Sequence, residues 1–507
     1  MDAVEDGSKN VTGIEKSASE CLHRFVVKSD KIKSTLIDSD GFHILNSKWD
    51  EVNLVFIASL WLLITLLSKI LIAKLNSEKI AESALQILIG VFFAIIFWLI
   101  DLPAQYYQFD AHLFFAFLLP PIIFDAGLFM PNLEFFNNFD SIMIFAVMGT
   151  VFNTFAIGAS LSILNSFGLS GDSMSTPDIM MFSSLISAVD PVAVIAVFEE
   201  IGVNKSLFVN VFGEALFNDA ISVVLFGIFK SFALTTDKVQ NIDYFYGFLG
   251  FFLVSLGGAF IGILFAGIAT IFAKFSKDLT ISPGVILLIS YLGYIVSEIC
   301  SFSSIIAIAV TGMVLQKYLN FILPEKSHQS LQIMTRNLAL SSESLTFILL
   351  GLATISIPQN WHTSFVIFTI IFCLLFRALA IFGLARMIPN KQILLKEQII
   401  ISFSGLRGAI AFGVVLTIPD QVAAKSIFAT TTLAVIFFSV IVQGCLIRPL
   451  LKLLRIELDT EKPNQNLEMA IPNIMSFVEV VAGRTGMNRI CQNFNNFNDK
   501  FILPYLK

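Results

Sequence analysis

The stretch Ser183-Ser-Leu-Ile-Ser-Ala-Val-Asp-Pro-Val-Ala-Val194 places a carboxylate and a proline in the middle of an apolar run. Proline has no backbone N–H and clashes with the preceding turn, so a helix breaks at this point. Within a membrane, a broken helix is tolerated only where its freed carbonyls face protein or a wet cavity. Hard cations prefer such oxygen ligands. We therefore expect a cation site at Asp190-Pro191; a simple proline kink is the structural alternative.

The composition places the rest of the chain in a membrane. Of 507 residues, 56% are hydrophobic and only 14% are charged, whereas soluble proteins carry about 25% charged residues. A soluble enzyme is therefore excluded. The formal charge of -6 provides no basic surface for nucleic acid. The five cysteines have no C-x-x-C spacing, so neither a disulfide framework nor a zinc site is expected. We expect a membrane protein that is not an enzyme and has no cofactor.

Thirteen apolar segments along the chain are candidate membrane spans, because a bilayer core needs roughly 20 apolar residues per helix. They predict an all-α polytopic membrane protein with three parts: a polar N-terminal tail (1–50), a transmembrane domain (51–450) and a short C-terminal tail (451–507). The segments are 52–72, 83–100, 112–130, 141–164, 178–198, 207–229, 244–272, 283–300, 303–316, 340–357, 364–388, 397–418 and 427–450.

The loops between these segments differ in positive charge. Counted alternately from the first span, and each together with the last four residues of the span before it, the odd loops hold twelve Lys and Arg residues, which include Lys69 and Arg386 at span ends, and the even loops hold three. Positively charged short loops stay on the cytoplasmic side. With an odd number of spans, the N-terminus is expected outside and the C-terminus inside. The triplet Asn10-Val-Thr12 then reads as a glycosylation sequon on the outer side, or as a chance match.

The sixth span, Phe212-Gly-Glu-Ala-Leu-Phe-Asn-Asp-Ala220, carries carboxylates that a membrane core does not tolerate without a function. Glu214 and Asn218 are four residues apart and share one helix face, and Ala215 and Asp219 form the next such pair. A carboxylate beside an amide in mid-span needs a cation or a proton. An interhelical hydrogen bond would explain Asn218, but it explains Asp219 less well. We expect Asp219 to take part in transport.

A second interruption occurs in the twelfth span, Phe403-Ser-Gly-Leu-Arg-Gly-Ala409. Gly405 and Gly408 flank Arg407 within an apolar run, which is typical of an interrupted helix. One break in each half of the chain points to an inverted-repeat secondary transporter whose site lies at mid-membrane. We therefore predict an inverted-repeat fold with two broken helices.

Arg377 stands in an otherwise uncharged eleventh span. A buried guanidinium without a partner is very costly, so a carboxylate must neutralise it. Glu214 is the first candidate for that carboxylate and Glu343 is the second. Such a pair would have a purely architectural role or would support the ion site.

Five motifs together resemble the eukaryotic sodium/proton exchanger family, over essentially 52–500. The segment Phe114-Phe-Ala-Phe-Leu-Leu-Pro-Pro-Ile-Ile-Phe-Asp-Ala-Gly127 looks like the third span, 187–200 like the broken fifth span, and 212–219 like the Asn-Asp sixth span. Gly405-Leu-Arg-Gly-Ala-Ile-Ala-Phe412 and Val442-Gln-Gly-Cys-Leu-Ile-Arg-Pro-Leu450 are similar to the last two spans. Val189 and the Phe-Glu-Glu ending of the fifth-span motif are closer to the plasma-membrane branch than to the endosomal or vacuolar branch.

The resemblance implies an electroneutral antiporter that exchanges one sodium ion for one proton, regulates cytosolic pH and forms a homodimer. It implies that Asp219 carries the ion, that Asp190 assists it, and that Asn218 is the signature of electroneutral exchange. It further implies a structural ion pair between Glu214 and Arg377 and an amiloride-type inhibitor region. That region consists of Phe114, Phe115, Leu118, Pro120 and Pro121. A calcineurin-B-like EF-hand protein is expected on an amphipathic helix at 467–482, where a helix on the membrane or on the dimer partner is the alternative.

Two positions depart from the family pattern. The family usually has Gly-Glu-Ser-Leu-Leu-Asn-Asp, whereas Ala215 replaces that serine and Phe217 replaces a leucine here. A hydroxyl that could ligate sodium one turn before Asp219 is therefore absent, which leaves the choice among sodium, lithium and potassium open. A potassium-accepting exchanger, an ion channel and an inactive scaffold paralogue are the alternative functions.

Overall fold

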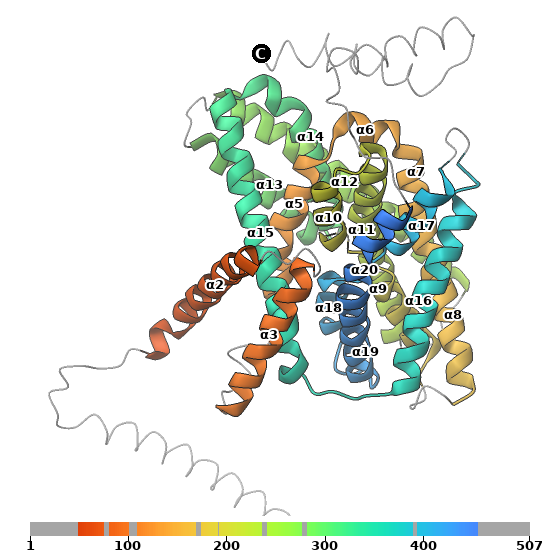
Figure 1. Ribbon diagram of the computed structural model, residues 1–507. Helices are drawn as coiled ribbons and strands as arrows, with labels where there is room; N and C mark the ends of the chain where they lie inside the picture. Colours follow the sequence, from red (N-terminus) through yellow and green to blue (C-terminus); the bar gives the residue numbers. More distant parts are fainter. Residues whose placement is uncertain are drawn as a thin grey trace, which may run out of the picture. The chain divides into compact units, whose positions relative to one another are not determined.

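The computed structural model describes residues 49–75, 81–100, 109–168, 174–190, 192–235, 241–275, 281–388 and 393–454. Within these ranges every regular element is helical (Figure 1). The elements are α2 (Trp49–Leu75), α3 (Glu82–Leu99), α4 (Ala111–Leu113), η2 (Phe114–Leu118), α5 (Leu119–Phe129), α6 (Asn132–Asn137), α7 (Phe139–Met143), η3 (Ile144–Gly149), α8 (Thr150–Ser166), α9 (Thr176–Ile186), α10 (Val192–Ile201), α11 (Lys205–Leu234), α12 (Asn241–Phe275), α13 (Ile281–Ile299), α14 (Ser304–Ile322), α15 (Glu325–Ser356), α16 (Thr363–Leu384), α17 (Leu395–Phe403), α18 (Ala409–Leu416), α19 (Lys425–Phe437), η4 (Phe438–Gln443) and α20 (Gly444–Leu454). Elements marked η are π-helical turns.

Each of the thirteen predicted spans coincides with a helix in the described part of the chain. Nine helices there are long and apolar enough to cross a membrane, and shorter apolar helices lie at Ser59–Ile72 and Ser304–Leu319. The remaining two spans are the broken pairs α9/α10 and α17/α18. The tenth span begins at Glu325 rather than at 340, because its polar first half continues the same helix. Polarity alone predicted a loop there.

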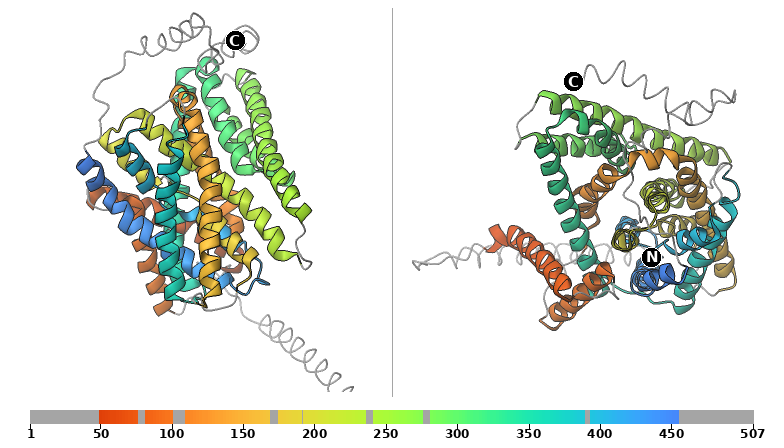
Figure 2. Two further views of the ribbon diagram at one scale, coloured as in Figure 1. Left: turned by 90° about the vertical axis from the view of Figure 1, so that its right-hand side faces the viewer. Right: turned by 45° about the horizontal axis from the view of Figure 1, so that its top comes forward.

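Two groups of helices pack within the compact unit that runs from Leu60 to the last described residue, Leu454. In the first group, α3 packs on α15, and α14 packs on α5, α12 and α13. In the second group, α9 packs between α8 and α11, and α16 packs on α8 and α19. The green helices α12–α15 and the blue-to-cyan helices α16–α20 lie on opposite sides in the right-hand view of Figure 2.

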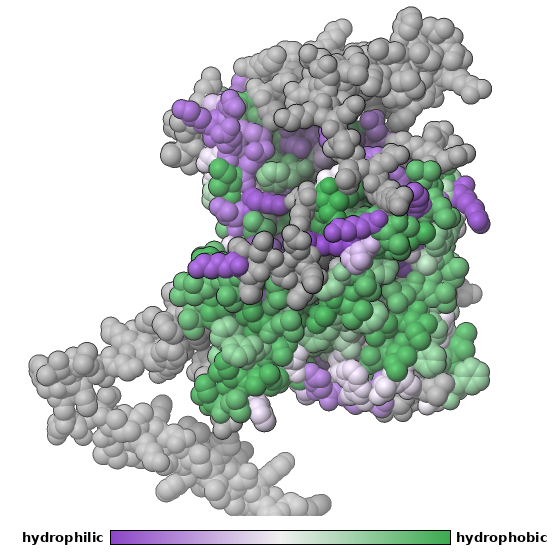
Figure 3. Space-filling view, viewed as in Figure 1, coloured by the Kyte–Doolittle hydropathy of each residue, from purple (hydrophilic) through white to green (hydrophobic). Residues whose placement is uncertain are grey.

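The outer surface of this unit carries large apolar side chains. Leu253, Leu256 and Phe260 of α12 are each more than 60% exposed, which is the opposite of a water-soluble surface. On the face drawn in Figure 3, apolar residues form a broad band, with polar residues gathered above it and along its lower edge. Such a distribution fits a helical bundle whose sides contact lipid.

The third span remains continuous although it contains Pro120 and Pro121. The turn before the prolines widens into the π-helical turn η2, in which the Leu119 N–H donates to the Phe114 carbonyl, five residues back. In this pattern the carbonyls of Phe115 and Ala116 would accept from residues 120 and 121, which are prolines and have no N–H. Tyr291 donates its hydroxyl to the Ala116 carbonyl at 2.9 Å, and Tyr294 donates to the Phe115 carbonyl at 2.7 Å. Two tyrosines of α13 therefore satisfy backbone oxygens that lack helical donors.

Glycines allow α3 and α15 to approach at backbone distance. A Cβ atom at Gly90 would overlap the carbonyl oxygen of Ile348. A Cβ atom at Gly351 would overlap the carbonyl oxygen of Ile87. Both obstacles are backbone atoms, which cannot rotate away. This crossing therefore depends on the absence of side chains, as close helix contacts in membranes generally do.

Gly90→Ala should destabilise the folded protein, because the α3–α15 crossing has to open to admit one methyl group. We expect a loss of about 1–3 kcal/mol, as is typical of overpacking, seen as a lower melting temperature of the detergent-solubilised protein. Gly267→Ala in α12 is the matched control, because no atom lies within 4 Å of the place that its methyl group would take. Equal melting temperatures for the two variants would contradict the described crossing.

Candidate functional site

The two broken helices meet at their breaks. Residues 187–190 follow α9 and residues 404–408 join α17 to α18. Asp190 and Leu406 form an antiparallel bridge, in which the Asp190 N–H donates to the Leu406 carbonyl at 2.8 Å. This bond replaces the helical bond that Asp190 would make to Ile186, four residues back. The crossing therefore satisfies backbone groups that the breaks remove from their helices.

Charged side chains compensate the helix ends at the crossing. The Arg407 side chain donates from Nη1 to the Ala188 carbonyl at 2.9 Å, just beyond the carboxyl end of α9. Asp190 lies against Gly408, the residue that precedes α18, and a Cβ atom on Gly408 would overlap the Asp190 carboxylate. A cation thus faces a negative helix end and a carboxylate faces a positive one. Glycine at 408 is what lets the carboxylate come so close.

Asn218 ties the sixth span to the crossing. Its Oδ1 accepts from the Val189 N–H at 3.0 Å, and its Nδ2 donates to Thr150 Oγ1 of α8 at 2.5 Å. The side chain is fully buried. Asn218 therefore joins α8, α11 and the segment after α9 through a single amide. This contact positions the residue that follows it, Asp219.

Asp219 is buried beside the crossing. Its side chain is 4% exposed, and the charged groups that act on it are Asp190 and Arg407. Within the described residues, no hydrogen bond joins the Asp219 carboxylate to another group. A buried carboxylate without a donor is costly as a bare charge. This position suits a group that always holds a proton or a cation.

The structure brings Arg377 of α16 and Glu214 of α11 together in a buried ion pair. The Arg377 side chain also donates from Nη2 to the Ile401 carbonyl of α17 at 3.1 Å. Gly405 packs directly on this guanidinium, since a Cβ atom there would lie 2.7 Å from Arg377 Nε. The second candidate partner from the sequence, Glu343, does not form this pair. Arg377 thus links the sixth span to the second broken helix.

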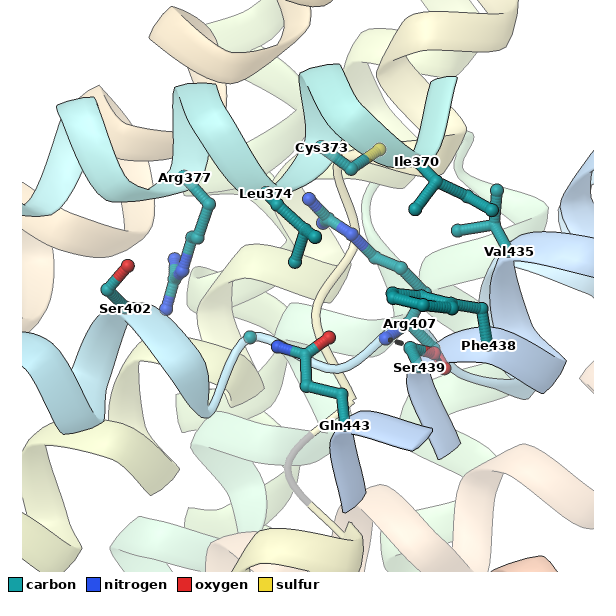
Figure 4. Close-up of a pocket in the computed structure, with 11 residues that line it drawn as sticks. Ile370, Cys373, Leu374, Arg377, Ser402, Arg407, Val435, Phe438, Ser439 and Gln443 are labelled. Atoms are coloured by element: carbon teal, nitrogen blue, oxygen red, sulfur yellow. Dashed lines mark hydrogen bonds between the residues drawn. The ribbon is translucent and has the colours of Figure 1, made fainter. Parts of the chain in front are cut away.

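A small cavity lies between α16, the second break and the last span (Figure 4). The Arg377 and Arg407 side chains both line it, and Arg407 points toward Cys373 of α16. Ser439 accepts from the Arg407 N–H at 3.2 Å. Gln443 donates to the Phe403 carbonyl at 2.6 Å, at the end of α17. The last span therefore holds the second break through Arg407 and Phe403.

The five residues of the implied inhibitor region lie in the third span, on η2 and the start of α5. Phe114 is buried and packs directly on Gly413 of α18, where a Cβ atom would lie 2.6 Å from its ring. Pro120 is also buried, as is its neighbour Leu119, whereas Phe115, Leu118 and Pro121 are partly exposed. This region therefore borders a half-helix of the crossing. Its role toward inhibitors remains a prediction.

Other residues that the sequence singled out lie away from the crossing or outside the described part of the chain. Asn10, Pro191 and the amphipathic segment 467–482 lie outside the described residues. Asp125, an ionisable residue of the third span, pairs with Arg336 of α15 at 3.0 Å. Glu298, at the end of α13, accepts from the Ser304 hydroxyl at 2.6 Å. These two carboxylates therefore have partners away from the crossing.

Three polar residues that hold the crossing in place were not predicted from the sequence: Thr150, Ser439 and Gln443. All three are buried and are bonded to a residue of a break or to Asn218. Thr150 was within reach of sequence reasoning, because it is one of several polar residues in the predicted span 141–164. The signal was a polar cluster at positions 150, 153 and 154, spaced for one helix face.

Crossed half-helices around buried carboxylates define a secondary transporter of the antiporter type. Comparisons agree with this class. The family model for the transmembrane part of the sodium/hydrogen exchangers matches residues 62–453. The chain is 45% identical over 489 residues to the probable Na⁺/H⁺ antiporter nhx-9 of Caenorhabditis elegans, covering 94% of this chain and 73% of the relative. It is 38% identical to sodium/hydrogen exchanger 3 of Homo sapiens, covering 92% of this chain and 57% of the relative.

The chain belongs to the sodium/hydrogen exchanger family, and it is a multi-pass transporter that exchanges sodium for protons. A solved structure, the sodium proton antiporter MjNhaP1 of Methanocaldococcus jannaschii, is similar with a TM-score of 0.62 at 16% identity. The similarity covers 80% of this chain and 100% of that one. At this identity the likeness shows the fold. The predicted all-helical antiporter fold is confirmed.

Removing one partner of the buried pair should strongly destabilise the protein, because the other charge is left uncompensated. For Glu214→Gln and for Arg377→Met we expect losses of about 3–5 kcal/mol each. The double variant Glu214→Gln/Arg377→Met should be more stable than Arg377→Met or Glu214→Gln alone. Thermal melting of the four purified proteins measures this; additive losses in the double variant would contradict a direct pair.

Proposed function

We propose that Asp219 is the group that carries either the sodium ion or the proton. The observation that carries this proposal is its position: a buried carboxylate with no hydrogen-bond donor among the described residues, beside the crossing of two broken helices. Burial disfavours the bare charge, so a proton and a sodium ion compete for one carboxylate. Asp190 assists from the crossing, and nearby oxygens complete the coordination of the cation.

Competition at one site accounts for obligatory exchange. The crossing opens alternately to the two sides of the membrane, and only an occupied site moves between them. Each cycle then moves one sodium ion against one proton, and the sodium gradient extrudes cytosolic protons. Asn218, as a neutral amide before Asp219, leaves a single carboxylate in that pair and supports an electroneutral cycle.

We also propose the orientation of the exchanger, its membrane, its oligomeric state and its partner protein. The charge asymmetry of the loops supports an outside N-terminus and a cytoplasmic C-terminus. We propose a homodimer in the plasma membrane, which binds a calcineurin-B-like EF-hand protein through the segment 467–482 and requires no cofactor. The similarity to the plasma-membrane branch of the family supports this assignment.

A potassium-accepting exchanger is the second candidate function, because one oxygen ligand is absent. Ala215 lies one turn before Asp219 and is fully buried, so its position brings no hydroxyl to the site. Fewer oxygens of fixed geometry weaken selection for the smaller cation. Replacing external sodium with potassium or lithium in the assay below distinguishes the two functions.

Asp219→Asn should abolish exchange, because an amide neither binds a proton nor balances a cation. The measurement is the recovery of cytosolic pH after an acid load in exchanger-deficient cells, with sodium outside. We expect recovery in cells with the unaltered chain and at least a tenfold lower rate in the variant, which corresponds to an activation free energy higher by about 1.4 kcal/mol or more.

Asp110→Asn is the matched control, because Asp110 is an exposed carboxylate that caps the short helix α4. It should recover like the unaltered chain. Surface labelling confirms that each variant reaches the membrane. Recovery that persists in Asp219→Asn would contradict the assignment of the carrier. A large current in place of coupled exchange would favour a channel, and no recovery with the unaltered chain at the surface would favour a scaffold.

A further inference from the structure

The helix α8 carries polar residues on its buried side at a point where they are costly. Thr150, Asn153 and Thr154 are fully buried, and their spacing places them on one helix face. The opposite face of α8 contains Phe152 and Phe155, which are 44% and 48% exposed. Asn153 and Thr154 thus point into the bundle rather than toward lipid.

The side chains of two of these three residues have no hydrogen-bond partner within the described part of the chain. Thr150 accepts from Asn218 and donates to the Ala146 carbonyl. In contrast, both amide atoms of Asn153 and the Thr154 hydroxyl are buried and unpartnered there. Each buried unsatisfied group costs about 1–3 kcal/mol. Three such atoms on one turn of a helix indicate a ligand that they are placed to bind.

The position of this turn follows from the contacts of α8 on either side of it. At one end, Thr150 bonds Asn218, which also bonds Val189 of the crossing. At the other end, Gly158 packs on Ser183 of α9, where a Cβ atom would lie 2.8 Å from Oγ. The helices α8 and α9 therefore run antiparallel. Asn153 and Thr154 lie level with the end of α9 and the start of the segment 187–190.

The chemistry of that level favours a cation. The end of α9 is a negative helix end, and its Ile186 carbonyl is not bonded by Asp190, whose N–H donates to Leu406. An amide oxygen, a hydroxyl and backbone carbonyls are neutral hard ligands that suit an alkali cation. Asp219 supplies the charge from α11, where Ala215 contributes no oxygen.

We propose that Asn153 and Thr154 form a further part of the cation site and supply neutral oxygen ligands to the transported sodium ion from α8. This inference rests on the proposed role of Asp219 and extends it to a second helix. It explains how a site with alanine at 215 retains enough oxygens to bind sodium.

The test uses two variants of nearly unchanged shape, Asn153→Leu and Thr154→Val. Each should raise the sodium concentration for half-maximal acid recovery at least fivefold while leaving the maximal rate at saturating sodium within twofold. Sodium should also raise the melting temperature of the purified unaltered protein, and this shift should be lost in both variants. Without sodium their melting temperatures should be equal or higher, because orphan polar atoms have been replaced by apolar ones.

Thr432→Val is the matched control: Thr432 of α19 is equally buried, but its hydroxyl already donates to the Phe428 carbonyl at 2.7 Å. Its half-maximal sodium concentration should not change. Unchanged sodium dependence in Asn153→Leu and Thr154→Val, with exchange intact, would overturn the α8 ligands and leave the role of Asp219 standing. Absence of sodium-dependent recovery and of sodium stabilisation in the unaltered protein would overturn both.

Discussion

The rest of the structure depends on one contact, the antiparallel bridge between Asp190 and Leu406. Two helices that break in mid-membrane would each leave backbone groups without partners, at a cost that lipid cannot relieve. By crossing, each break supplies partners to the other. Asn218 holds one side of the crossing, and Ser439 holds the other. We propose that the ion site lies beside this crossing, between the helix ends.

The charges around the crossing form a balanced set. Arg407 faces the negative end of α9, Asp190 faces the start of α18, and Arg377 is neutralised by Glu214. Among the described residues, Asp219 is the carboxylate that this set leaves without a hydrogen-bond donor. Buried charges are stable when paired, so this exception supports the proposal that Asp219 is the group that changes its partner during function. This division separates residues that stabilise the fold from the residue that we propose carries the ion.

Much of this arrangement could be predicted from the sequence, because membranes make polar residues in apolar runs rare and informative. The two breaks, Asp219 and the partner of Arg377 all follow from residues that a span does not tolerate without a reason. The sequence could not predict that Asp190 would pair with Leu406, since a backbone bridge leaves no residue signature. Thr150 and Asn153 escaped because a threonine or asparagine in a span is usually satisfied within its own helix. The polar start of α15 was missed because hydropathy does not register an amphipathic helix.

The central claim is that one carboxylate binds sodium and protons in competition and without net charge movement. Its most direct test is exchange by the purified chain in liposomes, measured at several clamped membrane potentials and several pH values. The rate should not depend on the potential. The sodium concentration for half-maximal rate should rise by up to about tenfold for each unit that pH falls, because one proton displaces one cation. A rate that changes with the membrane potential, or a half-maximal sodium concentration that does not change with pH, would contradict a single shared site.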